Sequence, residues 1–479
     1  MTRIAAFLFL LFSLNITQAQ VKDAISKLEQ SSSMAGGSLS LAVIDPENGE
    51  LVYSHNPNLV MIPASIAKLV STATAFKILG ADYQFETVLG YIGTIDSGVL
   101  NGDLVIKGSG DPSMGSTRVE GNTTFADLVM NWSAEIKTAG IEKVLGSLIV
   151  YDEFYGSSST PRNWAWADLG NYYASGVGTL NMNENRIYLT FKSGASGKLS
   201  SMISIVPEIN GVTYTNEVIA GAAGTGDNAY VFGAPGQNER FVRGTIPPNK
   251  SEFTIKASPP DPNEFAGQLF YDGLSEMGIE ITGSVKLSSG ESVDWEEMTS
   301  ISSYSSPKLM EIIKATNFYS VNLFAEAVLI HAKKKMSSEE AFPMEQDWLT
   351  GYWESKLNKP GPSYLMDGSG LSRSNGMSAK FLAQVLDHMN EYESYKYSIP
   401  TAGVSGTVKR LCQGLDCSGK VRAKSGTMNR VKSYAGYIIG PEGKEYPFAI
   451  MVNNFSGSSS TIRTRISEIL NAAYLDLNE

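Results

Sequence analysis

The chain has 479 residues, a length that allows two or three domains, and 42% of them are hydrophobic against 18% charged. This composition supplies enough apolar side chains for a large packed core and excludes global disorder. The formal net charge of −11 argues against a nucleic acid as partner, because phosphate backbones attract basic surfaces. It also gives no general attraction to an anionic membrane.

The first 19 residues are typical of a secretory signal peptide. Arg3 gives a short basic start, residues 4–14 are almost all apolar, and Thr17 and Ala19 place small side chains around a cut after Ala19. A membrane anchor is the weaker alternative, since the apolar run is too short to span a bilayer and no second run of about 18 apolar residues follows. The residue directly after the cut is Gln20 and not a cysteine, which argues against a lipoprotein. Removal of Arg3 leaves the mature chain one charge more negative.

The first folded segment is predicted to be a strand pair that leads into a helix. Residues 38–45 and 50–53 alternate between apolar and polar side chains around a turn at 46–49, a pattern typical of two antiparallel strands. A helix is predicted from Ser65, because apolar residues recur at helical spacing behind it. This order indicates an α+β domain in which the helix packs on an antiparallel sheet.

That helix begins with Ser65-Ile66-Ala67-Lys68, which carries a candidate nucleophile and its base. Side chains three residues apart share a helix face, so the Ser65 hydroxyl and the Lys68 amine can meet at hydrogen-bond distance. A lysine placed among apolar residues can accept a proton from a serine. Alone, the pattern also fits a helix N-cap followed by a surface lysine. The three histidines lack a metal-binding spacing and no G-x-S-x-G elbow is present, which leaves lysine as the candidate base.

From about residue 85 to residue 283 the sequence is β-rich. One helix is predicted at 125–138, while residues 194–254 are rich in Gly, Ser and Asn and poor in helix signals. The clearest strands are predicted at 102–107, 145–150 and 186–191. We expect a β-rich insertion in one or two parts.

Helices return after residue 283, and the chain ends with a strand pair and a last helix. Three helices are predicted here: the first starts at 306–309, the second covers 317–331 and the third covers 379–390. Paired strands follow at 434–439 and 447–453, and the last helix covers 461–475. We expect these strands to join the N-terminal pair in one sheet, with the middle of the chain inserted.

Two cysteines, Cys412 and Cys417, lie five positions apart. In an oxidising compartment they can close a small loop, and we favour this local disulfide over free thiols. A metal site needs more ligands than two thiols, and the neighbouring residues supply none.

A second motif is Ser320-Val321-Asn322. A hydroxyl and an amide two residues apart on a tight turn can face a cleft together, where Ser320 would relay a proton and Asn322 would hold a substrate amide. An ordinary capped helix start is the alternative for this tripeptide.

A third motif is Lys424-Ser425-Gly426-Thr427. A strand with this sequence presents a cation and two hydroxyls, which suit a substrate carboxylate, beside a glycine that lets a ligand approach the backbone. The backbone N–H groups of Ser65 and Thr427 would form an oxyanion hole. The alternative is a basic edge strand with a turn.

S-x-x-K, S-x-N and K-[ST]-G in this order are the motif set of penicillin-binding proteins and β-lactamases. Over essentially the whole mature chain, the sequence resembles the low-molecular-mass class C penicillin-binding proteins, the D-alanyl-D-alanine carboxypeptidase/endopeptidase family of penicillin-binding protein 4 type. The most specific segments are Asp367-Gly368-Ser369-Gly370-Leu371-Ser372 and the context of Ser320 up to Glu326. Further matching segments are 110–112, 164–169, 259–262 and 402–407.

The resemblance implies an α+β fold: a penicillin-recognising serine transpeptidase-like (β-lactamase-like) domain, with an antiparallel sheet and helices on both faces. It also implies a long β-rich insertion after the nucleophile helix. We therefore expect a signal peptide at 1–19, a catalytic domain at 20–84 and 284–479, an inserted domain II at 85–180 and 258–283, and an inserted domain III at 181–257.

The resemblance also implies catalytic roles. Ser65 would be the acylated nucleophile and Lys68 its base, Ser320 the proton relay and Asn322 a substrate-positioning amide. Lys424 would supply positive potential.

For substrate binding, Ser425 and Thr427, with Gly426 between them, would hold the terminal carboxylate. Ser425 departs from the family's usual threonine but keeps the hydroxyl. The resemblance places Asp168, Arg373 and Met428 around the side chain of the third stem-peptide residue, where the two charges could pair with diaminopimelate. Asp168 as a solvated turn residue and Arg373 in a structural salt bridge remain open alternatives.

The expected function is a periplasmic serine DD-peptidase of peptidoglycan. It would hydrolyse D-Ala-D-Ala, D-Ala-diaminopimelate cross-links, or both, through an acyl-enzyme on Ser65, and β-lactams would acylate it. We expect no metal or organic cofactor, stem peptides as partners, and a possible homo-oligomer. The alternatives are a β-lactamase and a non-catalytic cell-wall binding protein.

Overall fold

The computed structural model describes residues 19–153, 160–291, 293–338 and 348–479, so the predicted signal peptide lies, apart from Ala19, outside the described residues. The chain forms two compact units. The first unit comprises Met1–Ala81, Ile313–Val321 and Val328–Glu479, and the second comprises Asp82–Ile312 and Asn322–Ala327.

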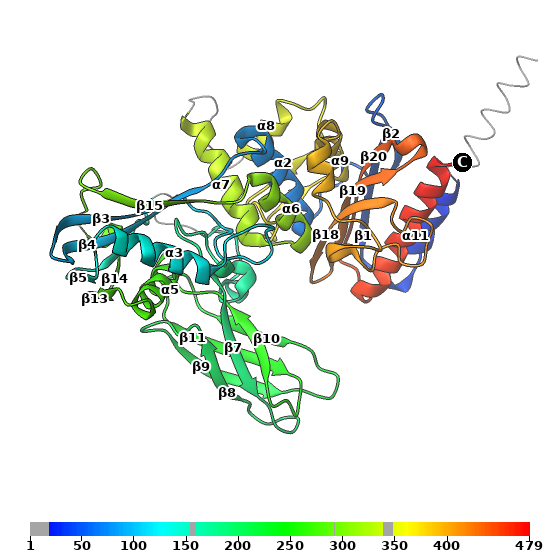
Figure 1. The fold of residues 1–479 in the computed structure, drawn as a ribbon. Coiled ribbons are helices and arrows are strands. Elements are labelled where there is room, and N and C mark those ends of the chain that lie inside the picture. The colour runs from blue at the N-terminus through cyan, green and yellow to red at the C-terminus, as the bar shows by residue number, and fades with distance from the viewer. Residues whose placement is uncertain (1–18, 154–159, 292, 339–347) are drawn as a thin grey trace, which may run out of the picture. The chain divides into compact units, whose positions relative to one another are not determined.

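The first unit contains a five-stranded antiparallel sheet that joins both ends of the chain, as predicted. Its outermost strand on one side carries the third motif. In spatial order the strands are β18 (Val421–Met428), β19 (Val431–Ile439), β20 (Glu445–Asn453), β1 (Ser38–Ile44) and β2 (Leu51–His55) (Figure 1).

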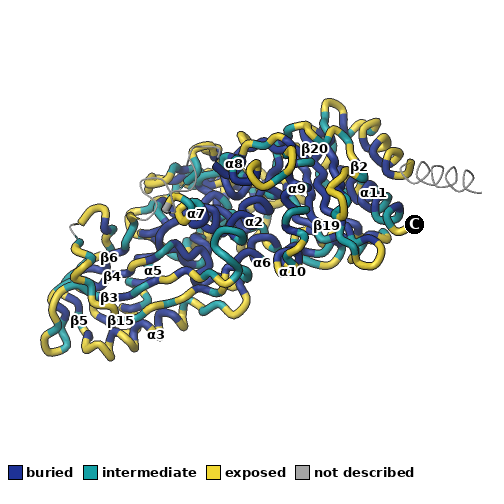
Figure 2. The backbone as a smooth tube through the Cα atoms, turned by 90° about the horizontal axis from the view of Figure 1, so that it is seen from above, coloured by how far each residue is buried: buried dark blue, intermediate teal, exposed yellow. Residues whose placement is uncertain are grey.

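Helices cover both faces of this sheet. On one face, α11 (Ser459–Leu477) and the helix at residues 19–29 share a core with alternate residues of β1, and the two helices lie side by side in Figure 1. On the other face lies α9 (Ala379–His388), which packs in turn on α2 (Ala67–Leu79). The first nine residues of α2 are buried all round (Figure 2), so this helix runs through the interior of the unit.

The disulfide favoured from the sequence is confirmed: Cys412 and Cys417 are joined. Their backbone N–H groups donate to Ser467 Oγ at 3.1 Å and Asn471 Oδ1 at 2.9 Å on α11. The loop is thereby fixed to the helix that covers the sheet.

The second unit is built mainly from three sheets. A seven-stranded sheet contains β3 (Glu86–Asp96), β4 (Val99–Gly108), β5 (Lys143–Val144), β6 (Leu148–Val150), β13 (Glu280–Ile281), β14 (Val285–Leu287) and β15 (Thr299–Ser305). Two three-stranded sheets contain β7 (Ile187–Lys192), β8 (Ser201–Val206) and β12 (Phe253–Ala257), and β9 (Thr213–Ala220), β10 (Asn228–Phe232) and β11 (Glu239–Ile246). The domain boundaries predicted above stay predictions, although β14 and β15 lie past residue 283 and pair within this unit.

Two helices of the second unit pack on each other. The helix α3 (Phe125–Thr138) has the predicted bounds, and its Trp132 stacks on Phe270 at 4.7 Å between ring centroids. Phe270 belongs to α5 (Pro262–Glu276), which was not predicted. Its start is nonetheless marked in the sequence, because Asp261 caps the N–H groups of Asn263 and Glu264 and Pro262 takes the first helical position.

The helix predicted at 317–331 starts elsewhere, and this prediction was wrong. The helix α6 (Leu309–Tyr319) continues past residue 317, the chain turns at Ser320 with φ of 60°, and α7 (Asn322–Ser338) begins after it. The apolar spacing runs through the break, so periodicity alone did not place it. The helix α8 (Trp348–Glu354) was not predicted either. Among the described residues, no helix combines the length and apolar character needed to cross a membrane.

Candidate active site

Ser65 lies on a single 3₁₀ turn (η2, Ala64–Ile66) that leads directly into α2, rather than on the α-helix itself. The predicted approach holds all the same, because Lys68 Nζ donates a hydrogen bond to Ser65 Oγ at 3.0 Å. Ser65 is half-buried and Lys68 is fully buried. A hydroxyl and an amine are thus held together at the edge of the interior.

A loop in the first unit holds Lys68 from its other side. Lys68 Nζ also donates to the carbonyl oxygen of Ser369 at 2.6 Å, and Ser71 Oγ donates to the carbonyl of Gly368 at 2.7 Å. Ser369 is one of the site residues that sequence reasoning missed. A backbone acceptor needs no particular side chain, so the sequence offers only the surrounding Asp-Gly-Ser-Gly run as a signal.

The buried Asp367 organises this loop. Its carboxylate accepts the backbone N–H groups of Gly370 at 2.8 Å and Ser372 at 2.6 Å, and the amide of Asn375 at 2.7 Å. Gly370 has φ of 77°, and an added Cβ would clash with the carbonyl oxygen of Ala64. The loop therefore packs directly on the turn that bears Ser65, and only glycine fits at the contact.

The second and third motifs meet through Lys424. Its Nζ donates to Ser320 Oγ at 2.8 Å and to the carbonyl of Ser425 at 2.8 Å. Burial, with repulsion from Lys68 and Lys432, holds the pKa of Lys424 well below its usual range. The left-handed backbone at Ser320 places its hydroxyl between α6 and α7, in reach of this lysine.

The rest of the third motif lies on the edge strand β18. Ser425 Oγ donates to Thr407 Oγ1 at 2.7 Å, and the exposed Thr427 accepts from Lys432 Nζ at 2.7 Å. A Cβ at Gly426 would lie 2.6 Å from the carbonyl oxygen of Pro63, the residue before η2. The close approach of β18 to the Ser65 turn therefore depends on this glycine.

Asn322 and Asp168 belong to the second unit, where one residue that was not predicted contacts both. The carbonyl of Tyr173 accepts from Asn322 Nδ2 at 2.6 Å, and its hydroxyl donates to Asp168 Oδ1 at 2.9 Å. Asp168 lies on α4 (Trp166–Leu169) and is half-buried. Burial and the Asp168 carboxylate raise the pKa of Tyr173.

Arg373 and Met428 lie in the first unit. Arg373 is exposed and Met428, the last residue of β18, is half-buried. Within the described parts of the chain, Arg373 makes no ion pair. The substrate roles of these two residues and of Asp168 stay predictions.

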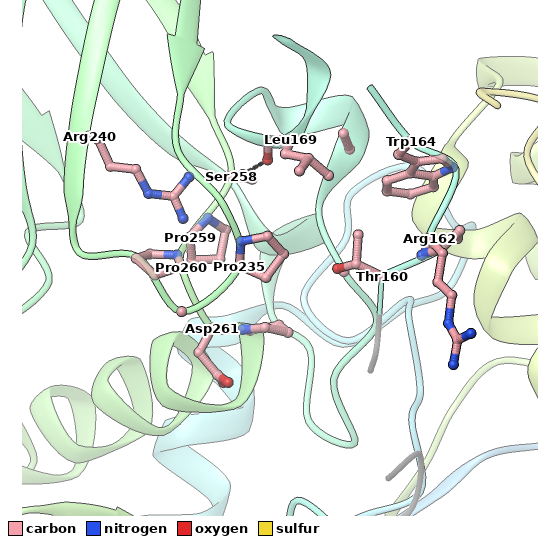
Figure 3. Close-up of a pocket in the computed structure, with 15 residues that line it drawn as sticks. Thr160, Arg162, Trp164, Leu169, Pro235, Arg240, Ser258, Pro259, Pro260 and Asp261 are labelled. Atoms are coloured by element: carbon pink, nitrogen blue, oxygen red, sulfur yellow. Dashed lines mark hydrogen bonds between the residues drawn. The ribbon is translucent and has the colours of Figure 1, made fainter. Parts of the chain in front are cut away.

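The described residues contain no group of three or more His, Cys, Asp or Glu side chains that could hold a metal ion. A cavity of about 450 Å³ opens in the second unit (Figure 3). Two of its charged residues already have partners within the protein: the buried Arg240 donates to the carbonyls of Gln237 and Gly233, and the half-buried Asp261 caps α5. No predicted site residue lines this cavity.

Comparisons with known proteins agree with the resemblance. Residues 20–473 match the D-Ala-D-Ala carboxypeptidase 3 (S13) family. A D-alanyl-D-alanine carboxypeptidase of an Actinomadura species is 27% identical over 470 residues, which cover 91% of this chain and 82% of the relative. The carboxypeptidase DacB of Haemophilus influenzae is 24% identical over 457 residues, covering 93% of this chain and 90% of the relative.

Among solved structures, penicillin-binding protein 4 of Haemophilus influenzae aligns with a TM-score of 0.79 at 22% identity, covering 96% of this chain and 99% of that chain. The likeness confirms the predicted α+β fold, with its antiparallel sheet, helices on both faces and β-rich insertion. The family match spans nearly the whole chain. The chain therefore belongs to the D-Ala-D-Ala carboxypeptidase 3 (S13) family, the serine peptidases of penicillin-binding protein 4 type.

Proposed function

We propose that this protein is a periplasmic DD-peptidase that hydrolyses peptidoglycan stem peptides through an acyl-enzyme on Ser65 and is acylated by β-lactams. One observation carries the proposal: the Ser65 hydroxyl accepts a hydrogen bond from a buried lysine that is fixed on its far side by the Ser369 carbonyl. A serine activated by a fixed base is the arrangement that nucleophilic catalysis requires.

In the acylation step, Ser65 Oγ attacks the carbonyl carbon of the penultimate D-alanine while its proton passes to Lys68 Nζ. Lys68 and Lys424 repel each other electrostatically, which favours a state in which only one of the two carries a charge. The transfer requires a neutral Lys68, and a substrate carboxylate bound beside Lys424 would offset the burial and repulsion that lower the pKa of Lys424.

Collapse of the tetrahedral intermediate breaks the peptide C–N bond and leaves an ester on Ser65. The leaving nitrogen needs a proton, which Ser320 would donate while it takes a proton in turn from Lys424. Water then attacks the ester, its proton returns through the same groups to Ser65, and the shortened peptide leaves.

Substrate recognition would use the edge strand. The hydroxyls of Ser425 and Thr427, with the charge of Lys424, suit the terminal carboxylate. The backbone N–H groups of Ser65 and Thr427 are the proposed oxyanion donors, supported by the contact of β18 with the Ser65 turn at Gly426. The roles of Asn322, Asp168, Arg373 and Met428 rest on the resemblance.

Intact mass of the mature protein after benzylpenicillin, followed over time beside Ser65→Ala, tests the proposal. A stable adduct on the wild type alone is the expected result. Rapid loss of the adduct with accumulating hydrolysed drug would indicate a β-lactamase, and no adduct at all would indicate a relative without this chemistry.

Two further measurements address the finer points of the proposal. Release of D-alanine from a pentapeptide, measured beside cleavage of a cross-linked peptide dimer, separates carboxypeptidase from endopeptidase activity. Cell fractionation tests the periplasmic location, and recovery of the protein in the cytoplasm would contradict it.

A further inference from the structure

A third buried lysine near the Ser65 turn, besides Lys68 and Lys424, contacts the proposed carboxylate site. Lys432 on β19 is the register partner of Thr427 on β18. Its Nζ donates to Thr427 Oγ1 at 2.7 Å, and the residue is only 8% exposed. The motifs do not include this lysine, and the proposed mechanism does not use it.

No carboxylate in the described residues neutralises Lys432. Its ammonium lies 5.2 Å from the ring centroid of Tyr434, and Arg463 on α11 repels it. A buried cation without an acidic partner is costly, so its presence at this position calls for a compensating role. An anion bound at Thr427 would supply the missing negative charge.

The direction of the hydrogen bond gives that role a mechanism. A hydroxyl has one hydrogen to donate and two acceptor positions, whereas a lysine ammonium only donates. The Lys432 bond therefore fills an acceptor position on Thr427 and leaves its hydrogen available for a ligand. A neutral Lys432 could instead accept the hydroxyl hydrogen of Thr427, which would then not be available to the ligand.

We infer that Lys432 is a positioning residue for carboxylate recognition, which orients the Thr427 hydroxyl as a donor to the substrate's terminal carboxylate and adds positive charge behind it. The inference rests on the proposed function, in which Thr427 holds that carboxylate. It assigns to Lys432 an effect on binding rather than on the bond-breaking steps.

The electrostatics of the position add a pH signature. Burial and repulsion from Arg463 lower the pKa of Lys432 to about 8. The groups that face it are Thr427 on β18, the Tyr434 ring on its own strand and Arg463 on α11, and Lys424 also interacts with it electrostatically. Above about pH 8 the ammonium becomes an amine, so binding of a carboxylate should weaken.

The experiment compares Lys432→Met and Lys432→Arg in the full mature chain, on an N-acylated peptide ending in D-Ala-D-Ala and on the same peptide with an amidated C-terminus. For Lys432→Met we expect the KM of the acid peptide to rise about tenfold with kcat within about threefold, and the amide to be hardly affected. Lys432→Arg keeps a donor and should stay within about threefold of the wild type. The rise of KM above about pH 8 should be absent in Lys432→Met.

Lys77→Met is the matched control. Lys77 also donates to a hydroxyl, that of Tyr392 at 2.5 Å, and also lies over a tyrosine ring, at 4.5 Å, but on the last turn of α2. Its substitution should leave both KM values unchanged. Should Lys432→Met fail to fold, Lys432→Gln takes its place in the comparison.

Three results would overturn the inference. An unchanged KM for the acid peptide in an active Lys432→Met protein would remove the role of Lys432 while the proposed function stands. Equal losses on the acid and amide peptides, or the same loss in Lys77→Met, would show a general structural effect. A wild type that cleaves neither peptide and forms no β-lactam adduct would overturn the proposed function and the inference with it.

Discussion

At the scale of single residues, the site depends as much on backbone groups as on the motif side chains. Lys68 is held between the Ser65 hydroxyl and the Ser369 carbonyl, and that carbonyl is placed by the loop that Asp367 organises. The serine and lysine were predictable because their spacing is a side-chain pattern. The carbonyl was not, since any residue presents one.

The first prediction concerns Gly370, whose added Cβ would clash with the Ala64 carbonyl beside Ser65. Gly370→Ala should slow acylation by benzylpenicillin at least about tenfold, because the loop that holds Lys68 would have to move. It should also destabilise the protein by more than the roughly 1 kcal/mol typical of alanine at positive φ. Stopped-flow acylation and thermal unfolding measure the two effects.

Gly443→Ala is the control for that variant. Gly443 has φ of 80°, close to the 77° of Gly370, but nothing lies within 4 Å of its added Cβ. It should carry the backbone strain alone and acylate at the wild-type rate. Equal acylation rates in both variants would show that the loop contact does not position Lys68.

The second prediction concerns the stability cost of Lys432. The pKa of Lys432 is about 8 in the folded protein and about 10.4 for a lysine in an unfolded chain. Below about pH 8 both states are protonated and the full cost of the buried charge applies. Between about pH 8 and 10.4 the folded state releases its proton first, so the unfolded state binds more protons and stability rises with pH.

Lys432→Met removes this titration. We therefore expect it to melt about 2 °C or more above the wild type at pH 7, with a difference that shrinks as the pH rises towards 10. Differential scanning calorimetry at several pH values measures the trend. A difference in melting temperature that stays constant or widens as the pH rises would contradict the view that the wild type buries the charge of Lys432. The expected gain in stability at a loss of binding is the usual trade-off at functional sites.

At the scale of elements, the sequence predicted segments with strong periodicity and missed those whose signal is local. The bounds of α3 and the pairing of β19 with β20 were predictable from apolar spacing and turn residues. The helix α5 was missed because the segment was interpreted as β-rich, although Asp261 and Pro262 mark its start. The break at Ser320 was missed because the apolar spacing continues across it, while the left-handed turn leaves no periodic signal.

The third prediction concerns the short helices around Tyr173. This residue holds Asp168 through its hydroxyl and Asn322 through its backbone carbonyl. Tyr173→Phe should therefore disturb only Asp168. If Asp168 pairs with the ammonium of a diaminopimelate side chain, kcat/KM for a stem peptide with that residue should fall about 3–10-fold, in line with one lost hydrogen bond.

Benzylpenicillin supplies the internal control for Tyr173→Phe, because it has no counterpart of the third stem-peptide residue. Its rate of acylation should stay within about twofold of the wild type. An equal loss with the drug and with the peptide would assign Tyr173 to the general architecture of the second unit instead of to side-chain recognition.

At the scale of the whole molecule, an acidic chain contains a site built on buried cations. The net charge is −11, yet Lys68, Lys424 and Lys432 are all buried around the Ser65 turn and β18. The composition indicated which partners to exclude, but it did not indicate that positive charges gather at the site of a negatively charged chain. Only the fold, which pairs β18 with β19 and packs both against the Ser65 turn, brings the three lysines together.

The last prediction concerns where the mature chain begins. The sequence predicts a cut after Ala19, and the family match starts at residue 20. Directly behind it, Val21, Ile25 and Leu28 are buried in the core that α11 shares with the sheet. A cut even a few residues later would therefore remove side chains from the core, at about 1.5–3 kcal/mol for each large apolar residue lost.

We accordingly expect N-terminal sequencing and intact mass of the secreted protein to give Gln20 as the first residue. Ala19→Arg, which removes the small side chain at the cut, should leave the precursor uncleaved and associated with the membrane fraction. Gln20→Ala, next to it but outside the small-residue pattern, should be processed normally. A mature N-terminus beyond Val21 would contradict the prediction, because the helix at residues 19–29 would then start without its first core contact.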